Sequence, residues 1–235
     1  MEYQCRVVES RPLSPSVFEL SFTPDRPLAF QAGQYISVVV PHEGKFLRRP
    51  YSIASAPEAS PIELCIQRIE GGPGSTFLQH LKPGDTFSGF APYGFLLYKP
   101  KANRDVIFIS TGTGLAPFRS MILSDAYAKQ PPRRALCLFG VRDEKEVFYE
   151  RDLSGREGLK WVPCLSRIDH AVAGAFRGRV TQYLTQHDDA IDWLNTDFYL
   201  CGNGAMIDEV KKTLKDRGVQ KDSIHQEIYF KPPKS

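Results

Sequence analysis

The sequence predicts a protein of α/β plus all-β class, in which an N-terminal antiparallel six-stranded β-barrel precedes a C-terminal parallel-sheet α/β domain. Short β-type segments separated by turn residues fill the N-terminal part, a rhythm typical of antiparallel barrels. Beyond it, strand-like and helix-like segments alternate, as in βαβ units. Residues 98–104 contain a polar Lys-Pro-Lys-Ala-Asn-Arg stretch typical of a linker. We therefore expect domains over residues 1–100 and 101–235.

The barrel strands are predicted from runs of β-branched, aromatic and aliphatic residues bounded by turn signals such as Ala32-Gly33 and Pro83-Gly84-Asp85. These runs cover residues 3–8, 17–22, 35–40, 51–54 and 62–69. One short helix is expected to begin at Ser75, because Ser-Thr-Phe-Leu-Gln resembles a helix start.

The second domain is predicted from alternating segments. Strands are expected over residues 105–110, 135–140, 160–166 and 197–201, with a last β-type run at 225–230. Helices are expected over residues 118–128, 148–155, 181–186 and 205–217. In open sheets of this kind, ligands bind beyond the carboxyl ends of the strands.

The bulk composition indicates an ordinary soluble globular protein. The 235 residues are 42% hydrophobic and 24% charged, and the net charge of +3 is too small to indicate nucleic-acid binding. The N-terminus lacks an apolar signal core, and no apolar run is long enough to span a bilayer, so a cytoplasmic location is expected. Five scattered cysteines show no metal-ligand spacing, so neither a metal site nor a disulfide framework is expected.

A glycine-rich turn follows the first strand of the second domain. Thr111, Gly112, Thr113 and Gly114 stand between a Val- and Ile-rich run and a helix-like run. Glycines let the backbone approach a ligand, and the free N–H groups of a helix start favour an anion. The turn is therefore interpreted as a cradle for phosphate or pyrophosphate, although its spacing differs from both common nucleotide-binding motifs. The alternative is a tight strand-to-helix turn without a ligand.

A second candidate site is Arg49-Pro50-Tyr51-Ser52. In an extended chain Arg49 and Tyr51 point to one face and Ser52 to the other. A flat ligand with a phosphate tail could use the aromatic face and the guanidinium together. The alternative is a surface arginine and a core tyrosine.

Two further segments have the same character. Three glycines, of which the last is Gly74, precede Ser75 and form a second anion-friendly loop, for which a helix cap at Ser75 is the alternative. Cys201-Gly202 ends the fourth parallel strand, where a thiol would lie at the ligand edge of the sheet. The alternative there is a buried cysteine before a turn.

Taken in order, these motifs resemble the ferredoxin–NADP reductase superfamily of flavoenzymes. The resemblance runs through Arg49-Pro50-Tyr51-Ser52, Gly72-x-x-Ser75-x-x-Leu78, Gly112-Thr113-Gly114-Leu115-Ala116-Pro117 and Cys201-Gly202, and it covers nearly the whole chain. It implies a barrel domain that binds FAD and an α/β domain that binds NAD(P).

The resemblance implies a set of flavin contacts. Arg49 would pair with a flavin phosphate, Tyr51 would pack on the isoalloxazine ring with Pro50 beside it, and Ser52 would bond near N5. The loop at Gly74, Ser75 and Thr76 would bind the pyrophosphate, with Thr113 a further contact. The strand that carries Cys65, Ile66 and Gln67 would touch the flavin through its backbone.

The resemblance also implies the nucleotide contacts. Thr111, Gly112, Thr113 and Gly114 would receive the pyrophosphate, and Cys201, with Gly202 and Met206 nearby, would lie beside nicotinamide C4. Ser166 and Arg167 match a pair that binds the 2′-phosphate, which favours NADPH, with NADH as the other possibility; Arg177 and Arg179 could help, whereas Asp169 weakens this reading. Glu227 would assist at the nicotinamide, and Tyr229 or Phe230 would cover the flavin.

The implied function is hydride transfer from NADPH to bound FAD, followed by electron transfer to a separate acceptor such as ferredoxin or flavodoxin. Ser52, Cys201 and Glu227 are the expected catalytic residues, and the acceptor is external because iron–sulfur cysteine spacing is missing. The alternatives are an NAD(P)H–flavin reductase, the reductase component of an oxygenase system, or a regulatory protein that binds nucleotide without turnover. Fold alone does not choose the acceptor.

Overall fold

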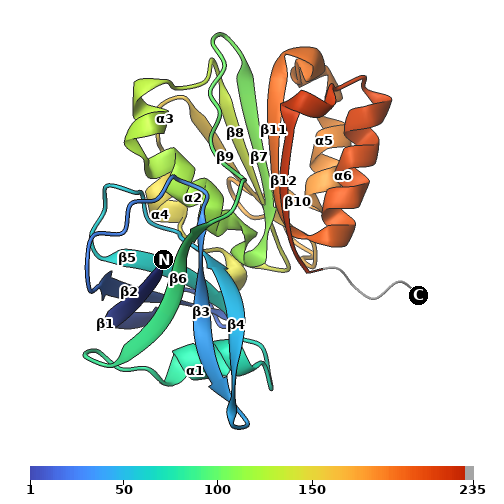
Figure 1. Cartoon of the computed structure of the whole chain (residues 1–235). Coiled ribbons are helices and arrows are strands. Elements are labelled where there is room, and N and C mark those ends of the chain that lie inside the picture. Colours follow the sequence, from blue (N-terminus) through green and yellow to red (C-terminus); the bar gives the residue numbers. More distant parts are fainter. Residues whose placement is uncertain (231–235) are drawn as a thin grey trace. The chain divides into compact units, whose positions relative to one another are not determined.

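The computed structural model describes residues 1–230 and divides into two compact units (Figure 1). Unit 1 comprises Met1–Tyr98 and Ala116–Lys129, and unit 2 comprises Lys99–Leu115 and the described chain from Gln130 onward. The chain therefore passes from one unit to the other three times. Among residues 1–230, no helix has both the length and the hydropathy needed to cross a bilayer.

Unit 1 is built on a six-stranded antiparallel sheet with strand order β4-β3-β6-β1-β2-β5, which confirms the predicted N-terminal architecture. Alternate residues of β1 point inward, and with large apolar residues such as Phe18 and Phe22 they fill a single core. The strands are β1 (Glu2–Pro12), β2 (Val17–Pro24), β3 (Tyr35–His42), β4 (Lys45–Ser52), β5 (Ile62–Gln67) and β6 (Thr86–Tyr93).

Two strands of unit 1 differ from expectation. The run at residues 51–54 is only the end of β4, which begins at Lys45, and β6 follows no predicted run. The sequence of β6 is broken by Gly89 and Pro92, which are poor strand formers. A Cβ atom at Gly89 would lie 2.6 Å from Cδ1 of Ile36 on β3, so a side chain there would force the buried Ile36 side chain to shift.

The helix α1 (Pro73–His80) begins two residues earlier than predicted. Gly72 is its N-cap residue and Pro73 occupies the first turn, where the missing N–H of proline costs nothing. Ser75 is therefore not a cap. Its hydroxyl lies inside the helix, accepts a hydrogen bond from the Ile69 N–H and donates to backbone carbonyls of Ile69 and Gly72.

The single helix expected over residues 118–128 is two helices, α2 (Ala116–Leu123) and α3 (Asp125–Lys129). They separate at Ser124, whose hydroxyl donates to the Met121 carbonyl at 2.7 Å and accepts from the Tyr127 N–H at 3.2 Å. A serine hydroxyl that bonds nearby backbone competes with the helical ladder, which explains the break.

Helix α2 belongs to unit 1 because its polar side chains bond the barrel. Arg119, 6% exposed, donates to the Ala54 carbonyl at 2.9 Å and to Oε2 of Glu63 at 2.5 Å. Ser120 donates to the Ser55 carbonyl at 2.6 Å. The segment that follows the glycine-rich turn is thus anchored to the sheet of unit 1.

Unit 2 is a six-stranded parallel sheet with strand order β10-β9-β8-β7-β11-β12, as predicted from the alternating segments. Figure 1 shows α5 (Val180–Gln186) and α6 (Gly204–Asp216) together on one face. The helix expected over residues 148–155 is the single turn α4 (Glu150–Leu153), and the two-residue β10 was not predicted. The strands are β7 (Asp105–Thr111), β8 (Ala135–Val141), β9 (Leu159–Leu165), β10 (Phe176–Arg177), β11 (Thr196–Asn203) and β12 (Ile224–Phe230).

The stretch at residues 98–104, predicted to be a linker, is largely bound to unit 2. The buried carboxylate of Asp197 on β11 accepts from Nζ of Lys101 at 3.0 Å and from Nε of Arg104 at 3.1 Å. The Lys99 N–H donates to the Tyr199 hydroxyl at 2.9 Å. Unit 1 ends at Tyr98 and unit 2 begins at Lys99, so the stretch lies at the boundary as expected, and its polar residues also serve as partners for a buried charge.

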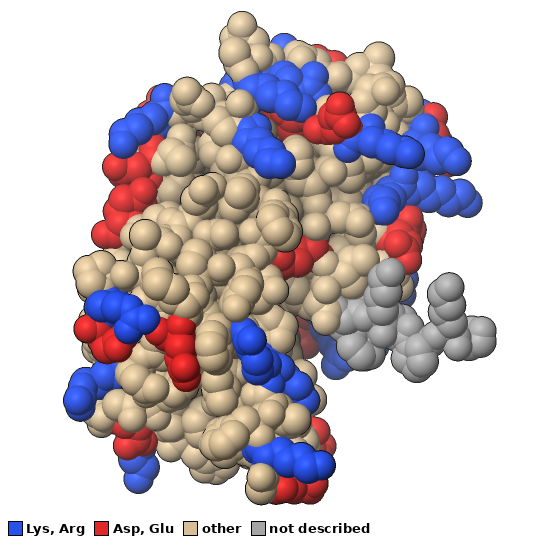
Figure 2. Space-filling view, viewed as in Figure 1, with Lys and Arg blue, Asp and Glu red and all other residues tan. Residues whose placement is uncertain are grey.

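A second buried carboxylate, Asp105, begins β7 and accepts hydrogen bonds from Arg133 and Arg134 at 2.5 to 3.0 Å. Burial by itself would raise the pKa of Asp105, but the bonds and charges of the two arginines outweigh it and hold that pKa below its usual range. Figure 2 shows Lys and Arg side chains, with acidic ones among them, gathered at this end of unit 2.

Candidate functional site

The residues singled out in unit 1 lie along the seam at which its sheet closes. Ile53, just after β4, forms an isolated antiparallel bridge with Leu64 on β5, and the Ala54 N–H donates to the Glu63 carbonyl at 2.8 Å. At this seam β4, which carries Ser52, lies in contact with β5, which carries Cys65 and Gln67. The two predicted flavin-contact segments are therefore brought together by the barrel, although they are distant in sequence.

Helix α1 completes this group of residues. The α-carbon of Gly74 faces Arg49 and Tyr51, because a Cβ atom at this position would collide with the Tyr51 hydroxyl and lie 3.1 Å from Cγ of Arg49. The structure thus brings Arg49, Tyr51 and Gly74 into contact. Burial raises the pKa of Tyr51 to about 12 despite the nearby Arg49 charge, so its phenol remains protonated at neutral pH.

Burial and hydrogen bonds limit how most of the other predicted flavin residues could contact a ligand. Ile66 is 0% exposed and its side chain belongs to the core, so only its backbone could contact a ligand. Cys65 is also buried, and Nε2 of Gln67 donates to the Ser16 carbonyl at 3.0 Å. Thr76, by contrast, is exposed on the first turn of α1.

This set of groups fits FAD. Arg49 is partly buried and donates one bond to the Arg48 carbonyl at 3.0 Å, and a guanidinium has four further N–H donors for phosphate. Tyr51 offers an aromatic ring, and Ser52, 5% exposed, a hydroxyl at the same seam. Because Gly74 has no side chain, the backbone of α1 can lie directly against Arg49 and Tyr51.

In unit 2, the predicted residues converge at the carboxyl ends of three adjacent strands. Cys201 on β11 pairs with Ser110 on β7 on one side and with Glu227 on β12 on the other. Thr111 ends β7, and its hydroxyl accepts a hydrogen bond from the Asn203 N–H at 3.0 Å. Thr111, Cys201 and Glu227 therefore share one sheet edge.

The glycines at this edge have a role that the sequence did not reveal. Gly114 lies in a 3₁₀ helix (η1, Gly112–Leu115), and a Cβ atom there would lie 2.6 Å from the Cys201 carbonyl carbon. A Cβ atom on Gly202, whose φ is +123°, would lie 2.5 Å from Oγ1 of Thr111. At both positions protein atoms occupy the space that a side chain would fill, so packing within unit 2 also requires these glycines.

Cys201 is a buried, neutral thiol. Desolvation raises its pKa well above the usual range, and the charge of Glu227 adds to this effect. Hydrogen bonds from Tyr229 and from the Gly202 backbone act in the opposite direction but do not outweigh burial. A group in this state presents S–H and sulfur surface and does not act as a thiolate nucleophile.

The two aromatic residues near the C-terminus are described to different extents. Tyr229 is 40% exposed and is hydrogen-bonded to Cys201. The side chain of Phe230 lies outside the described part of the structure, as does the tail after it.

The residues predicted to choose between coenzymes lie where β9 ends. Ser166 and Arg167 are exposed, and the Arg167 N–H donates to the Arg142 carbonyl at 2.7 Å, so two arginines meet here. The carboxylate of Asp169 is paired with the imidazole of His170 at 3.1 Å. Arg177 donates to the Asp169 carbonyl at 3.3 Å.

One residue at this edge was missed from the sequence. Oδ1 of Asn203 accepts from the N–H groups of Ala205 and Met206 at 2.8 and 3.3 Å and so caps α6. The same residue bonds Thr111 through its N–H. An asparagine directly before a helical run is an N-cap signal, so its capping role could have been predicted.

Comparison with known proteins agrees with this arrangement. A family model described as an oxidoreductase FAD-binding domain matches residues 4–98, and one described as an oxidoreductase NAD-binding domain matches residues 108–212. The ferredoxin–NADP reductase B of Sorangium cellulosum is 33% identical, and the alignment covers 97% of each chain.

Relatives from oxygenase systems are also similar. The phenol hydroxylase P5 protein of Acinetobacter pittii is 31% identical over 97% of this chain but only 66% of its own length. The crystal structure of a cytochrome P450 reductase from Amycolatopsis superposes with a TM-score of 0.84 at 27% identity, covering 97% of this chain and 70% of the other. Since the alignment with a ferredoxin–NADP reductase extends over almost all of both proteins, the chain belongs to the ferredoxin–NADP reductase family of oxidoreductases, which bind FAD and NAD(P)H.

Proposed function

We propose that this chain transfers hydride from NADPH to bound FAD and passes the electrons to ferredoxin or flavodoxin. The observation that carries the proposal is the end-to-end similarity to a ferredoxin–NADP reductase, which includes both nucleotide-binding domains. When bound, FAD supplies the exchange of one hydride for two single electrons. Residues of the chain bind and orient the two nucleotides for this exchange.

In unit 1, Arg49 would hold a flavin phosphate and Tyr51 would cover the ring, while Ser52 would donate a hydrogen bond to it. The closeness of Arg49, Tyr51 and Gly74 supports this assignment, since one ligand could contact all three. Gly74, Ser75 and Thr76 would contact the pyrophosphate through backbone N–H groups, because the Ser75 hydroxyl is already bonded to backbone. The domain that binds FAD would thus comprise residues 1–100.

In unit 2, Thr111 to Gly114 would contact the pyrophosphate of NADPH, and Cys201, Gly202 and Met206 would contact its nicotinamide half. Their common position at the carboxyl ends of β7 and β11 supports this assignment. Residues 101–235 would form this nucleotide-binding domain. Glu227, opposite Cys201, would assist through its carboxylate, and Tyr229 or Phe230 would cover the flavin.

We also propose that the coenzyme is NADPH. The backbones of Arg167 and Arg142 are hydrogen-bonded at the end of β9 and both residues are exposed, so their guanidinium groups would suit a phosphate dianion better than a ribose hydroxyl. Asp169 and Glu144 share the imidazole of His170, which when protonated offsets part of the negative charge that counts against this assignment.

The electrons pass from the flavin to a separate acceptor. Similarity to oxygenase reductases favours a second candidate function, that of a reductase component that serves an oxygenase. An acceptor panel with NADH and NADPH distinguishes the readings. Fast reduction of ferredoxin or flavodoxin with retained FAD is expected. If the flavin is lost on dialysis and the protein reduces added free flavin, it is instead a flavin reductase. If the protein oxidises neither NADH nor NADPH, the proposal is overturned.

The flavin site is tested by Arg49→Ala, which should purify with a lower ratio of flavin to protein absorbance. The matched control is Arg48→Ala, because Arg48 lies one residue away and its guanidinium packs over the Phe90 ring at 4.2 Å. Neighbours on a strand face opposite sides. Equal flavin content in the two variants would contradict the role given to Arg49.

A further inference from the structure

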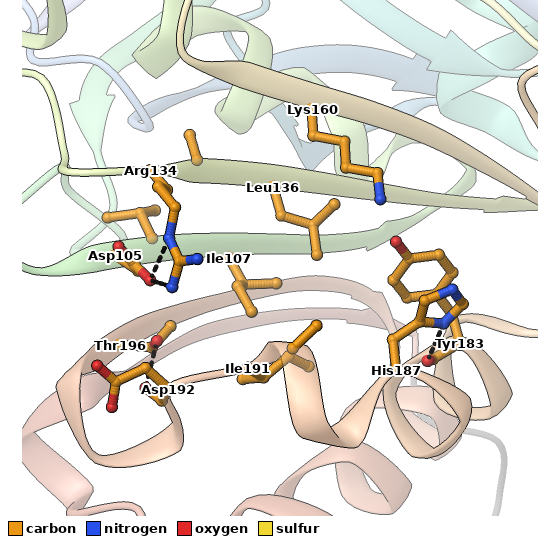
Figure 3. A pocket seen from close by; sticks show the side chains of 13 residues that line it. Asp105, Ile107, Arg134, Leu136, Lys160, Tyr183, His187, Ile191, Asp192 and Thr196 are labelled. Atoms are coloured by element: carbon orange, nitrogen blue, oxygen red, sulfur yellow. Dashed lines mark hydrogen bonds and ion pairs between the residues drawn. The ribbon is translucent and has the colours of Figure 1, made fainter.

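Unit 2 contains a cavity that the proposed function does not use. It has a volume of about 240 Å³ and lies on the sheet face that α5 covers, near the start of β7 and β8 (Figure 3). Thr111 and Cys201, in contrast, lie at the carboxyl ends of the strands. The cavity is therefore at the opposite end of the sheet from the predicted nucleotide contacts.

The cavity exists because α5 is too short for the strands beneath it. With seven residues, α5 is about 10 Å long, whereas each seven-residue strand from β7 to β9 is about 23 Å long. Residues 187–196, which include the two 3₁₀ turns η3 (Asp188–Ala190) and η4 (Trp193–Asn195), cross the remaining surface. These short turns cover the surface less completely than a continuous helix would, and a hollow is left.

The walls of the cavity are mainly apolar. Figure 3 shows Ile107 and Leu136 on the sheet side and Ile191 facing them from the crossing segment. One end is aromatic, since the rings of Tyr183 and His187 stack with centroids 3.9 Å apart and an interplanar angle of 11°. A flat hydrocarbon body is complementary to this space.

The charges around the cavity leave one cation in excess. Asp105 is paired with Arg133 and Arg134, and Asp192 is paired with Arg133 at 3.1 Å. Lys160 on β9 lies 5.8 Å from the centroid of the Tyr183 ring, and no carboxylate within residues 1–230 pairs with it. The ammonium group at the aromatic end is thus available to an anion.

We propose that this cavity binds a small aromatic carboxylate, with its carboxylate at Lys160 and its ring between Leu136 and Ile191. A phosphate or sulfate would lose its hydration over apolar walls without compensation, whereas an aromatic acid uses both the walls and the cation. The volume is smaller than the roughly 300 Å³ at which sites for drug-sized ligands begin, which limits the ligand to about one ring. Charge and shape therefore point to the same chemical class.

The experiment is isothermal titration of the full-length, FAD-loaded protein with benzoate, benzyl alcohol and acetate. Benzoate should bind saturably and more tightly than the other two, which lack either the charge or the ring. Lys160→Met should weaken benzoate binding about tenfold, because it removes one charge-assisted contact. The control is Lys212→Met, a change of an exposed lysine on α6 outside the cavity, which should leave binding unchanged.

Ala190→Phe provides a second variant, since Ala190 is an exposed residue of the cavity wall and a larger side chain there should fill the space without disturbing the core. The proposal is overturned if benzoate does not bind, if acetate or benzyl alcohol binds as tightly, or if neither Lys160→Met nor Ala190→Phe weakens benzoate binding. FAD content and NADPH oxidation are measured separately, so failure here is distinguishable from failure of the proposed function.

Discussion

The replacement Gly114→Ala separates two explanations for the glycines of the nucleotide turn. If Gly114 only lets a ligand approach, alanine should weaken NADPH binding and leave folding intact. In the structure the added Cβ atom would lie 2.6 Å from the Cys201 carbonyl carbon and 2.8 Å from the α-carbon of Gly202. The variant should therefore destabilise unit 2 even without nucleotide.

The expected magnitude follows from these contacts. The nearest atom is the Cys201 carbonyl oxygen, and to bring it to an ordinary contact of about 3.4 Å the backbone of η1 or β11 must move by about 1 Å. All three atoms that the new methyl group meets are backbone atoms of β11, which is paired on both sides and cannot shift alone. Overpacking of this kind costs about 2–3 kcal/mol in the free energy of unfolding.

Guanidinium unfolding followed by tryptophan fluorescence measures this loss. The chain has two tryptophans, Trp161 and Trp193, and both belong to unit 2, so the signal reports that unit. The control is Gly155→Ala, because Gly155 has φ +75° and an added methyl group there would meet no atom within 4 Å. Its left-handed backbone alone should cost about 1 kcal/mol.

The reasoning is refuted if Gly114→Ala loses no more stability than Gly155→Ala while its affinity for NADPH falls. That result would mean that β11 adapts easily and that the glycine serves the ligand only. A loss clearly larger than that of the control, measured without nucleotide, supports the packing explanation.

Three further substitutions probe other parts of the molecule. Cys201→Ala should slow flavin reduction by NADPH about tenfold in stopped-flow absorbance while FAD stays bound, because the proposed role of the thiol is to position the nicotinamide; an unchanged rate would remove Cys201 from the proposed site. Arg119→Met should lower the free energy of unfolding of unit 1 by about 2 kcal/mol, which is less than for a fully buried ion pair because Glu63 is 23% exposed. FAD should therefore be released at a lower temperature on heating, and an unchanged release temperature would show that the ion pair does not stabilise the unit. Arg167→Ala should lower kcat/KM for NADPH about tenfold with little change for NADH; an equal loss with both coenzymes would argue against 2′-phosphate recognition.

Much of the fold could be predicted because its signals are local. The strands of the parallel sheet are largely apolar runs, and Gly follows β7 and β11, so β7, β8, β9 and β11 were placed to within about two residues. The strand β6 was missed because Gly89 and Pro92 interrupt its pattern. The predicted helix over residues 118–128 was wrong at Ser124, where the serine hydroxyl bonds the backbone and divides the helix in two.

The candidate site could be predicted as a set of residues but not as an arrangement. Arg49, Tyr51 and Gly74 were chosen from two separate motifs, and only the closed sheet and the packing of α1 show that they touch. Likewise, Cys201 and Glu227 became neighbours through the pairing of β11 with β12. Such contacts join residues that are distant along the chain, for which a single sequence carries no periodic signal.

By itself, the sequence determined the order of the two architectures and the chemical groups available at each strand end, because composition and short-range spacing encode these properties. The family was indicated by the resemblance of its motifs to those of known members. The tertiary structure decided what those groups do to one another. Gly114 and Gly202 illustrate the difference: both were singled out from the sequence as ligand contacts, and the structure shows that their Cβ directions are filled by Cys201 and Thr111. Whether a glycine faces a ligand or another strand depends on how segments pack, and packing is a property of the folded chain.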